Sequence, residues 1–187
     1  MSTVVAYKFL ATGGAGPISG VQWPLPVRAG EPGAWLGSEG PVLMCKSGIH
    51  ACTTQELAYW LHEELWRVEL DGALEAGLDC VMAPRGRLLE KVSAWSNGGA
   101  QRFAAAVRDH AAAAIAARGV EIEARLTGYV EDSSWHVRHG ALESPALAAL
   151  CAAVAVAKIA APAEEEAAYR RERAWQSHYI ATEMELV

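Results

Sequence analysis

The sequence lacks the features that mark nucleic-acid-binding, membrane and secreted proteins. It has 16 lysines and arginines against 22 aspartates and glutamates, a formal net charge of -6. Because phosphate binding needs clustered Lys and Arg, we expect no duplex nucleic acid as a partner. The longest apolar run, residues 146–157, is too short and too rich in alanine to span a bilayer. The first residues have neither the basic start nor the long apolar core of a secretory signal, so we expect a cytoplasmic protein without a membrane partner.

Cysteine is also scarce, with four residues in the whole chain: Cys45, Cys52, Cys80 and Cys151. In a reducing compartment such cysteines are thiols or metal ligands rather than disulfides. Cys151 falls on the apolar face of a predicted helix, where cysteine serves as a small buried hydrophobic residue. The other three thiols belong to the N-terminal half of the chain.

The composition that is present indicates a globular protein with two different halves. Hydrophobic residues make up 52% of the 187 positions and charged residues 20%, which is typical of globular domains. Glycine, proline and most tryptophans precede Asn97, and alanine dominates after it. We therefore predict an α+β domain at residues 1–96 and a helical C-terminal region at 97–187 packed on it. The fold class expected is α+β, with a small bent mixed or antiparallel sheet, a capped helix and an Ala-rich helical half.

Periodicity places the individual elements. Strands are predicted at Val4–Leu10, 42–45, 66–70, 80–83 and 87–92, the third from a clean alternation of Trp66, Val68 and Leu70 with charged residues. Helical spacing predicts a helix from about residue 100 to Gly119, where glycine caps the end. Further helices are predicted from residue 144 to Pro162 and from about residue 163 onward, the last with Trp175, Tyr179 and Leu186 facing inward. Residues 120–130 fit a strand and a helix equally well.

The most informative segment is Cys45-Lys-Ser-Gly-Ile-His-Ala-Cys52, followed directly by Thr53-Thr-Gln-Glu56. Thr53 and Glu56 have the spacing of a capping box, and Leu57, Trp60, Leu61 and Leu65 would form one helical stripe after it. The pattern predicts that two thiols and an imidazole lie where a strand ends and a helix begins. A helix N-terminus offers unpaired N–H donors and partial positive charge, so reactive or ligating groups are often found there.

Two kinds of chemistry follow from these residue types alone. Cys45, His50 and Cys52, with Cys80 or His62 as a fourth ligand, could hold tetrahedral zinc. The spacing is not one of the strong paired-cysteine patterns, and strand alternation turns residues 50 and 52 to the face opposite residue 45.

The second possibility is a nucleophilic cysteine. Cys52 precedes the helix cap, where the helix dipole lowers a thiol pKa, and His50 could act as its base. A buried strand cysteine, however, needs no chemistry, and cysteine is among the most buried residue types.

The order of several motifs resembles an uncharacterised family of bacterial and phage proteins. The residues that carry the resemblance are Tyr7-Lys8, the segment 45–52, Tyr59-Trp60-Leu61 and Arg67-Val-Glu-Leu-Asp-Gly72. In that family a Gly-Ile-His-Ala-Cys or Gly-aromatic-His-Ala-Cys motif precedes a helix and a strand. The match covers residues 4–95 and implies no established activity.

More distantly, Gly48-Ile-His-Ala51, Ala58-Tyr59 and Val68–Gly72 resemble the NAD-binding core of ADP-ribosyltransferases of the poly-ADP-ribose polymerase and toxin type. The resemblance implies attack on the anomeric carbon of a nicotinamide ribose through an oxocarbenium-like state, which depends on positioning and electrostatics. His50 stands here in place of the family's usual tyrosine.

The same resemblance implies a site. His50 would line the nicotinamide pocket, Glu90 would be the catalytic glutamate, and Tyr7, Gly48 and Tyr59 would contact the cofactor. We therefore expect an ADP-ribosyltransferase-like NAD-binding protein of unknown acceptor, whose partner is a small-molecule nucleotide.

The alternative is a non-enzymatic binding or regulatory protein, in which the Cys45-His50-Cys52 segment is a structural element, with or without zinc. A packed, closed segment with His50 hydrogen-bonded to the backbone would favour this alternative. Trp23 and Trp35, in a proline-rich loop, are the indoles expected to stack on a base or sugar. The Ala-rich helices could bury a face against a second copy, giving a homodimer.

Overall fold

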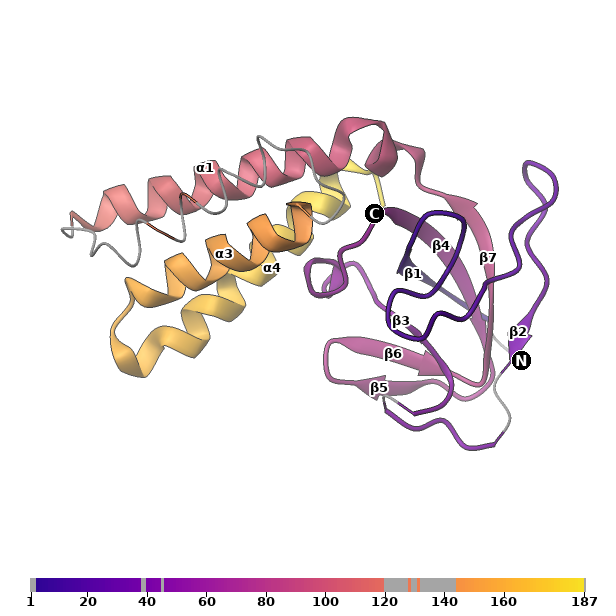
Figure 1. Cartoon of the computed structure of the whole chain (residues 1–187). Coiled ribbons are helices and arrows are strands. Elements are labelled where there is room, and N and C mark those ends of the chain that lie inside the picture. The colour runs from indigo at the N-terminus through magenta and orange to yellow at the C-terminus, as the bar shows by residue number, and fades with distance from the viewer. Residues whose placement is uncertain are drawn as a thin grey trace. The chain divides into compact units, whose positions relative to one another are not determined.

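The computed structural model describes residues 3–37, 40–44, 46–119 and 144–186, together with Gly128 and Glu131. The chain divides into two compact units, Met1–Ser96 and Asn97–Val187, and Figure 1 shows the strands of the first and the helices of the second. The ambiguous stretch 120–130, apart from those two single residues, lies outside the described part of the chain. Each unit is considered by itself.

The larger sheet of the first unit has four strands in the order β1-β4-β7-β2, all paired antiparallel. Its strands are β1 Val4–Leu10, β4 Glu64–Asp71, β7 Arg85–Lys91 and β2 Leu36–Gly37. The predicted alternation in β4 is confirmed, because Val68 and Leu70 are fully buried while Arg67 is exposed. The register between β4 and β7 shifts at Arg67/Val68, which is the mark of a β-bulge.

A second antiparallel sheet has the order β3-β6-β5, formed by Ile49–Ala51, Cys80–Ala83 and Glu75–Gly77. It is joined to the first sheet by a bridge between Tyr7 and Cys52, whose backbone N–H groups each donate to the other's carbonyl oxygen at 2.8 Å. The motif segment is therefore held by two sheets at once. The fold class predicted from the sequence, α+β with a small antiparallel sheet, is confirmed.

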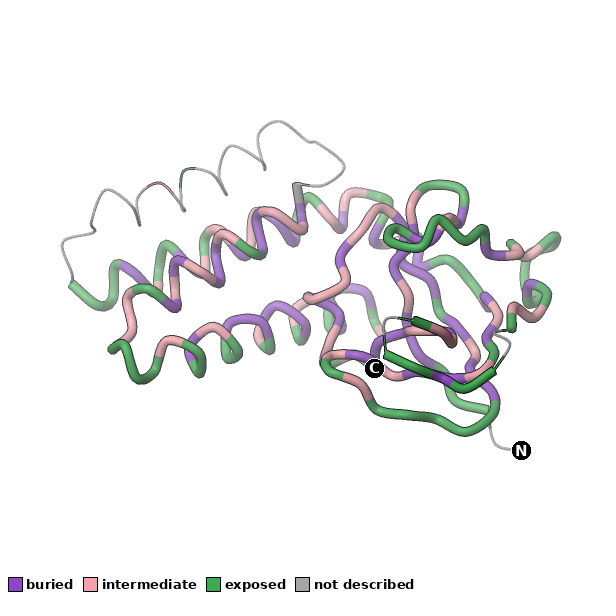
Figure 2. The backbone as a smooth tube through the Cα atoms, turned by 60° about the horizontal axis from the view of Figure 1, so that its bottom comes forward, coloured by how far each residue is buried: buried purple, intermediate pink, exposed green. Residues whose placement is uncertain are grey.

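The core of this unit is built from residues of both sheets, and the buried backbone segments are purple in Figure 2. Its fully or nearly fully buried members are aliphatic and aromatic side chains from both sheets and from the loop after β1: Ala6, Leu10, Trp23, Ile49, Ala51, Trp66, Val68, Leu70, Ala83 and Leu88. Burial of side chains of this size is the main stabilising contribution to a domain.

The helix predicted after the motif is reduced to one turn, a 3-10 helix at Leu57–Tyr59. Half of the predicted capping box forms, since Glu56 Oε2 accepts a 2.7 Å hydrogen bond from the Thr53 backbone N–H. The reciprocal half does not, because the 3-10 helix has Glu56 rather than Thr53 as its N-cap and no side-chain cap hydrogen bond. The predicted helical stripe through Leu65 is wrong, because that residue belongs to β4. The backbone instead pairs antiparallel with β1 from Glu64 onward and with β7 from Trp66 onward. The strand predicted at 42–45 is limited to a single bridge between Leu43 and Ser47.

The second unit contains the helices α1 Ala100–Arg118, α3 Ser144–Lys158 and α4 Glu165–Glu183, the last preceded by a 3-10 turn at Pro162–Glu164. Helix α1 ends as predicted at Gly119, which has the left-handed φ of 60°. The buried residues of α3 are nearly all alanines, so α1 and α4 can both pack closely on it, and α1 contributes larger buried side chains such as Phe103 and Ile115. None of the helices in the described residues has the length and apolar character needed to cross a membrane.

The buried face of α4 includes polar and charged residues beside apolar ones, which the sequence did not suggest. Trp175 and Tyr179, predicted to face inward, are only half-buried, whereas Glu172, Gln176 and Ser177 are buried. Gln176 Nε2 donates to the carbonyl oxygen of Ala149 in α3 at 3.0 Å. Helix α4 is therefore held through hydrogen bonds as well as through apolar contact.

Candidate functional site

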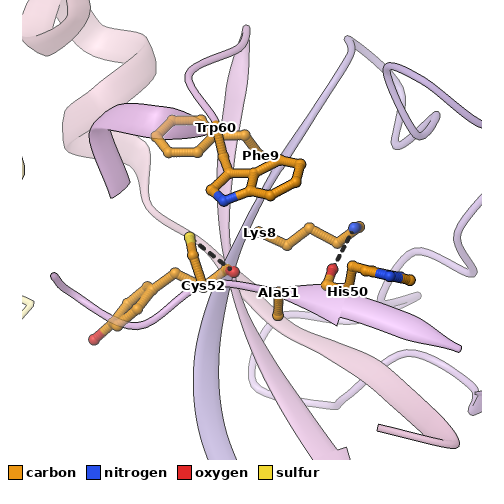
Figure 3. Close-up of a pocket in the computed structure, with 7 residues that line it drawn as sticks. Lys8, Phe9, His50, Ala51, Cys52 and Trp60 are labelled. Carbon is orange, nitrogen blue, oxygen red and sulfur yellow. Dashed lines mark hydrogen bonds between the residues drawn. The ribbon is translucent and has the colours of Figure 1, made fainter. Parts of the chain in front are cut away.

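The motif segment borders a small cavity between β1, β3 and the 3-10 turn (Figure 3). Seven residues line it: Tyr7, Lys8, Phe9, His50, Ala51, Cys52 and Trp60. Its volume is about 20 Å³, which is room for roughly one water molecule. Pockets for drug-sized ligands measure about 300–1,000 Å³. The site brings together chemically useful groups, but the cavity is too small for a drug-sized ligand.

Cys52 is buried and its thiol is engaged. The Sγ atom donates to the Tyr7 carbonyl oxygen at 3.4 Å, the dashed contact in Figure 3. Burial, with the Glu56 carboxylate as a smaller contribution, raises the pKa of the Cys52 thiol. A thiol rather than a thiolate is therefore present at neutral pH, and only the thiolate is a strong nucleophile.

His50 is held by the backbone of its own turn. Its Nδ1 lies 3.2 Å from the Gly48 carbonyl oxygen, and since a carbonyl only accepts, this contact places the proton on Nδ1. The tight turn requires Gly48, whose φ is +100°, a conformation that glycine adopts at little cost. The imidazole is therefore oriented by a local turn.

Lys8 belongs to the Tyr7-Lys8 motif, but the sequence predicted no role for it in the site. Its Nζ donates to the His50 carbonyl oxygen at 2.6 Å and lies 5.3 Å from the centre of the Trp23 ring. Removal from solvent lowers the pKa of Lys8 from 10.5 to about 8. The sequence held one signal for this, because Lys8 shares a strand face with Ala6 and Leu10, both buried.

The remaining residues of the predicted NAD site lie elsewhere. Glu90, on β7, has a side chain 61% exposed and forms an ion pair with Arg67 at 2.9 Å. Neither Glu90 nor Tyr59 is among the residues that line the cavity. Of the five predicted site residues, the structure thus brings Tyr7 and His50 to the cavity, with Gly48 bonded to the imidazole.

The zinc hypothesis depends on Cys45, which lies outside the described residues. Within the described ranges, no group of three or more His, Cys, Asp and Glu side chains could hold a metal ion. Cys80, considered as a fourth ligand, is buried with its Sγ 3.9 Å from the Met44 Sδ. The other candidate, His62, accepts a 2.9 Å hydrogen bond from Trp95 Nε1 at its carbonyl oxygen.

The two tryptophans considered for stacking on a ligand contact cations of the protein instead. Trp23 is 3% exposed and faces the Lys8 ammonium group. The guanidinium carbons of Arg85 and Arg87 lie 4.9 and 4.6 Å from the centre of the Trp35 ring. Such contacts are worth about 0.5–1 kcal/mol at exposed sites and more when desolvated. Both indoles therefore contribute to the stability of the sheet unit.

Comparison with known proteins found no match: no family model, no curated protein and no solved structure is similar to this chain. The resemblances described from the motifs therefore stay predictions, and function has to be argued from the geometry of the site.

Burial of Cys52 predicts slow alkylation. In the native protein at pH 8, iodoacetamide should modify Cys52 far more slowly than in urea-unfolded protein, because the thiol is buried and its pKa is raised. Peptide mass mapping after timed quenching resolves each cysteine, and the half-buried Cys151 provides an internal comparison. Equal rates for Cys52 in the two states would restore the nucleophile hypothesis.

Proposed function

We propose that the protein is a non-enzymatic binding or regulatory protein and that its 45–52 segment is a structural element. The observation that carries this proposal is the closed hydrogen-bonding of the segment. His50 Nδ1 contacts the Gly48 carbonyl oxygen, and the His50 carbonyl oxygen accepts from Lys8. The Cys52 thiol donates to the Tyr7 carbonyl oxygen. These groups stabilise the junction of two sheets.

The size of the cavity supports the same conclusion. A volume of about 20 Å³ would have to increase about fifteenfold before it reached the lower end of the range for small-molecule pockets, roughly 300 Å³. The cavity walls are formed by paired strands and by Trp60, whose Nε1 donates to the Asp79 carbonyl oxygen at 2.5 Å. Opening the cavity for a nicotinamide ring would break these contacts.

A binding role is supported by apolar side chains on the loop between β1 and β2. Ile18 and Val27 are 88% and 92% exposed, and Val21 and Leu25 in the same loop are 45% and 40% exposed. Scattered exposed apolar residues are ordinary, but several within one loop are typical of surfaces that contact other proteins. We infer a protein partner for this loop.

NAD binding is the second candidate, and one observation favours it. Tyr7 and His50, which the resemblance to ADP-ribosyltransferases predicts at the cofactor, line one cavity. Under this hypothesis the cavity would widen on binding, and a carboxylate other than the exposed Glu90, or Glu90 after rearrangement, would act on the ribose.

Isothermal titration with NAD, on protein analysed for zinc, separates the two candidates. We expect no heat up to about 1 mM NAD, the upper end of usual substrate affinities. Binding that is lost in His50→Ala but retained in His178→Ala, an exposed histidine of the helical unit, would overturn our proposal in favour of the NAD site. One zinc per chain, lost in His50→Ala, would make the segment a metal-stabilised structural element.

A further inference from the structure

The helical unit contains a second and larger cavity, about 240 Å³ in volume. Residues of all three described helices and of the turn after α3 line it: His110, Ala114, Arg118, Val156, Ile159, Ala160, Ala168, Arg171 and Glu172. This volume is slightly below the usual range for drug-sized ligands. It suits a small molecule.

The helical repeat explains why these side chains converge. His110, Ala114 and Arg118 follow one another at intervals of four along α1, so they share one face of that helix. Arg171 and Glu172 lie three and four residues after Ala168 in α4 and share a face in the same way. The cavity is therefore built on two regular helices, which position side chains better than loops do.

The two arginines at this cavity differ from neighbouring cations. Lys158 pairs with Glu165, and Arg170 pairs with Glu166 at 2.8 Å. Within the described residues, neither Arg118 nor Arg171 forms an ion pair or a hydrogen bond through its side chain, and both are exposed. Their guanidinium groups are available to an external anion, which arginine can bind bidentately.

The one acidic group of the cavity is already engaged. Glu172 is 3% exposed, and its Oε2 lies 3.0 Å from His110 Nδ1. Its Oε1 accepts from Gln176 Nε2 at 3.3 Å. The His110 ring also stacks on Trp175, with ring centres 3.7 Å apart and planes at 6°. Glu172 is thus held by groups within the helical unit. Because two arginines and only one carboxylate line the cavity, its lining carries a net positive charge.

The remaining walls are apolar, formed by Ala114, Val156, Ile159, Ala160 and Ala168. We propose that the cavity binds a small aliphatic carboxylate, with its chain against these walls and its carboxylate between Arg118 and Arg171. Burial of the chain would supply affinity and the arginines would select the charged head. This site goes beyond the proposed function of the 45–52 segment, because it uses no residue of that segment.

The test is isothermal titration of the full chain with sodium octanoate, 1-octanol and sodium sulfate. We expect octanoate to bind at one molecule per chain and the other two compounds not to bind. Arg171→Gln and Arg118→Gln should each weaken octanoate binding by about tenfold, the loss of one charged hydrogen bond. Arg170→Gln, which changes an adjacent arginine that does not line the cavity, should bind like the wild type.

Each other outcome counts against the proposal. Absence of octanoate binding, or equal binding by all three arginine variants, would overturn it. Octanol binding as tightly as octanoate would indicate an apolar cavity without charge selection, and sulfate binding equally well would indicate an anion site without a role for the aliphatic walls. Thermal unfolding of each variant separates lost binding from lost folding. Arg118 also lies in the last turn of α1, where a cation offsets the helix dipole, so Arg171→Gln is the more direct test.

Discussion

Replacing Lys8 by methionine should remove a rise in stability that the wild-type protein shows between about pH 8 and 10.5. The cause is the lysine itself, whose pKa falls from 10.5 in the unfolded chain to about 8 in the native protein. Below pH 8 both states are protonated, and the native state carries the full cost of removing an ammonium group from water. Above pH 8 the native state loses the proton first, so it binds fewer protons than the unfolded state and stability increases with pH.

The increase should be on the order of 3 kcal/mol across this range, since each pKa unit corresponds to about 1.4 kcal/mol. Urea denaturation at several pH values, compared between wild type and Lys8→Met, measures it, because other titrating groups cancel in the difference. Lys46→Met is the matched control, since Lys46 is an exposed lysine of the same unit. Parallel stability curves for wild type and Lys8→Met would show that Lys8 is solvated in the native protein.

Substituting Gly48 by alanine should lower the free energy of unfolding by about 3 kcal/mol. Two costs combine, because alanine is strained at a φ of +100° and its Cβ would lie 2.9 Å from Val42 Cγ1 and 3.3 Å from the Ala83 carbonyl oxygen. The turn that fixes His50 would have to shift to relieve both. The midpoint of chemical denaturation measures the loss.

Gly13→Ala separates the two costs. Gly13 has a similar φ of +82°, but within the described residues no atom lies within 4 Å of a Cβ built there. This control should lose only about 1 kcal/mol, the conformational part. If both variants lose the same amount, the close approach of Val42 to the turn contributes nothing, and the packing described for the motif is wrong.

The elements that the sequence predicted well are those in which one local pattern is sufficient. Alternating Trp66, Val68 and Leu70 marked β4 because one face of that strand is core. Gly119 marked the end of α1 because a left-handed residue there needs no tertiary context. The strand β5, Glu75–Gly77, was not predicted, because it is short and its first two residues are exposed.

The errors arose where tertiary contacts override local preference. Thr53 and Glu56 form one of the two hydrogen bonds of a capping box, yet the helix stops after one turn because β4 pairs with β1 from Glu64 and with β7 from Trp66 onward. On α4, burial of Glu172 and Gln176 depends on partners in α1 and α3. No helical periodicity reveals such partners, so the rule that apolar residues face inward fails for Trp175 and Tyr179 although it holds for Ile180 and Ala181.

The sequence predicted only part of the candidate site for the same reason. Proximity in the chain indicated that His50 and Cys52 act together, and the structure places both at one cavity with Tyr7. The contact of Lys8 with the His50 carbonyl oxygen joins residues 42 positions apart. Only the pairing of β1 beside β3 creates it, so the strand pattern that places Lys8 on a core face does not show which group Lys8 contacts.

The pairing of β1 with later segments also means that this strand cannot complete its hydrogen bonds until those segments have been synthesised. Strand β1 binds residues 64–70 on one edge and Cys52 on the other, so it emerges from the ribosome long before its partners do. An unpaired strand as apolar as Val4–Leu10 is prone to pair with other chains. While β1 is still unpaired, Lys8 is solvated and fully charged, and one charge within such a strand opposes aggregation. We expect the lysine that weakens the finished sheet at neutral pH to protect the nascent chain.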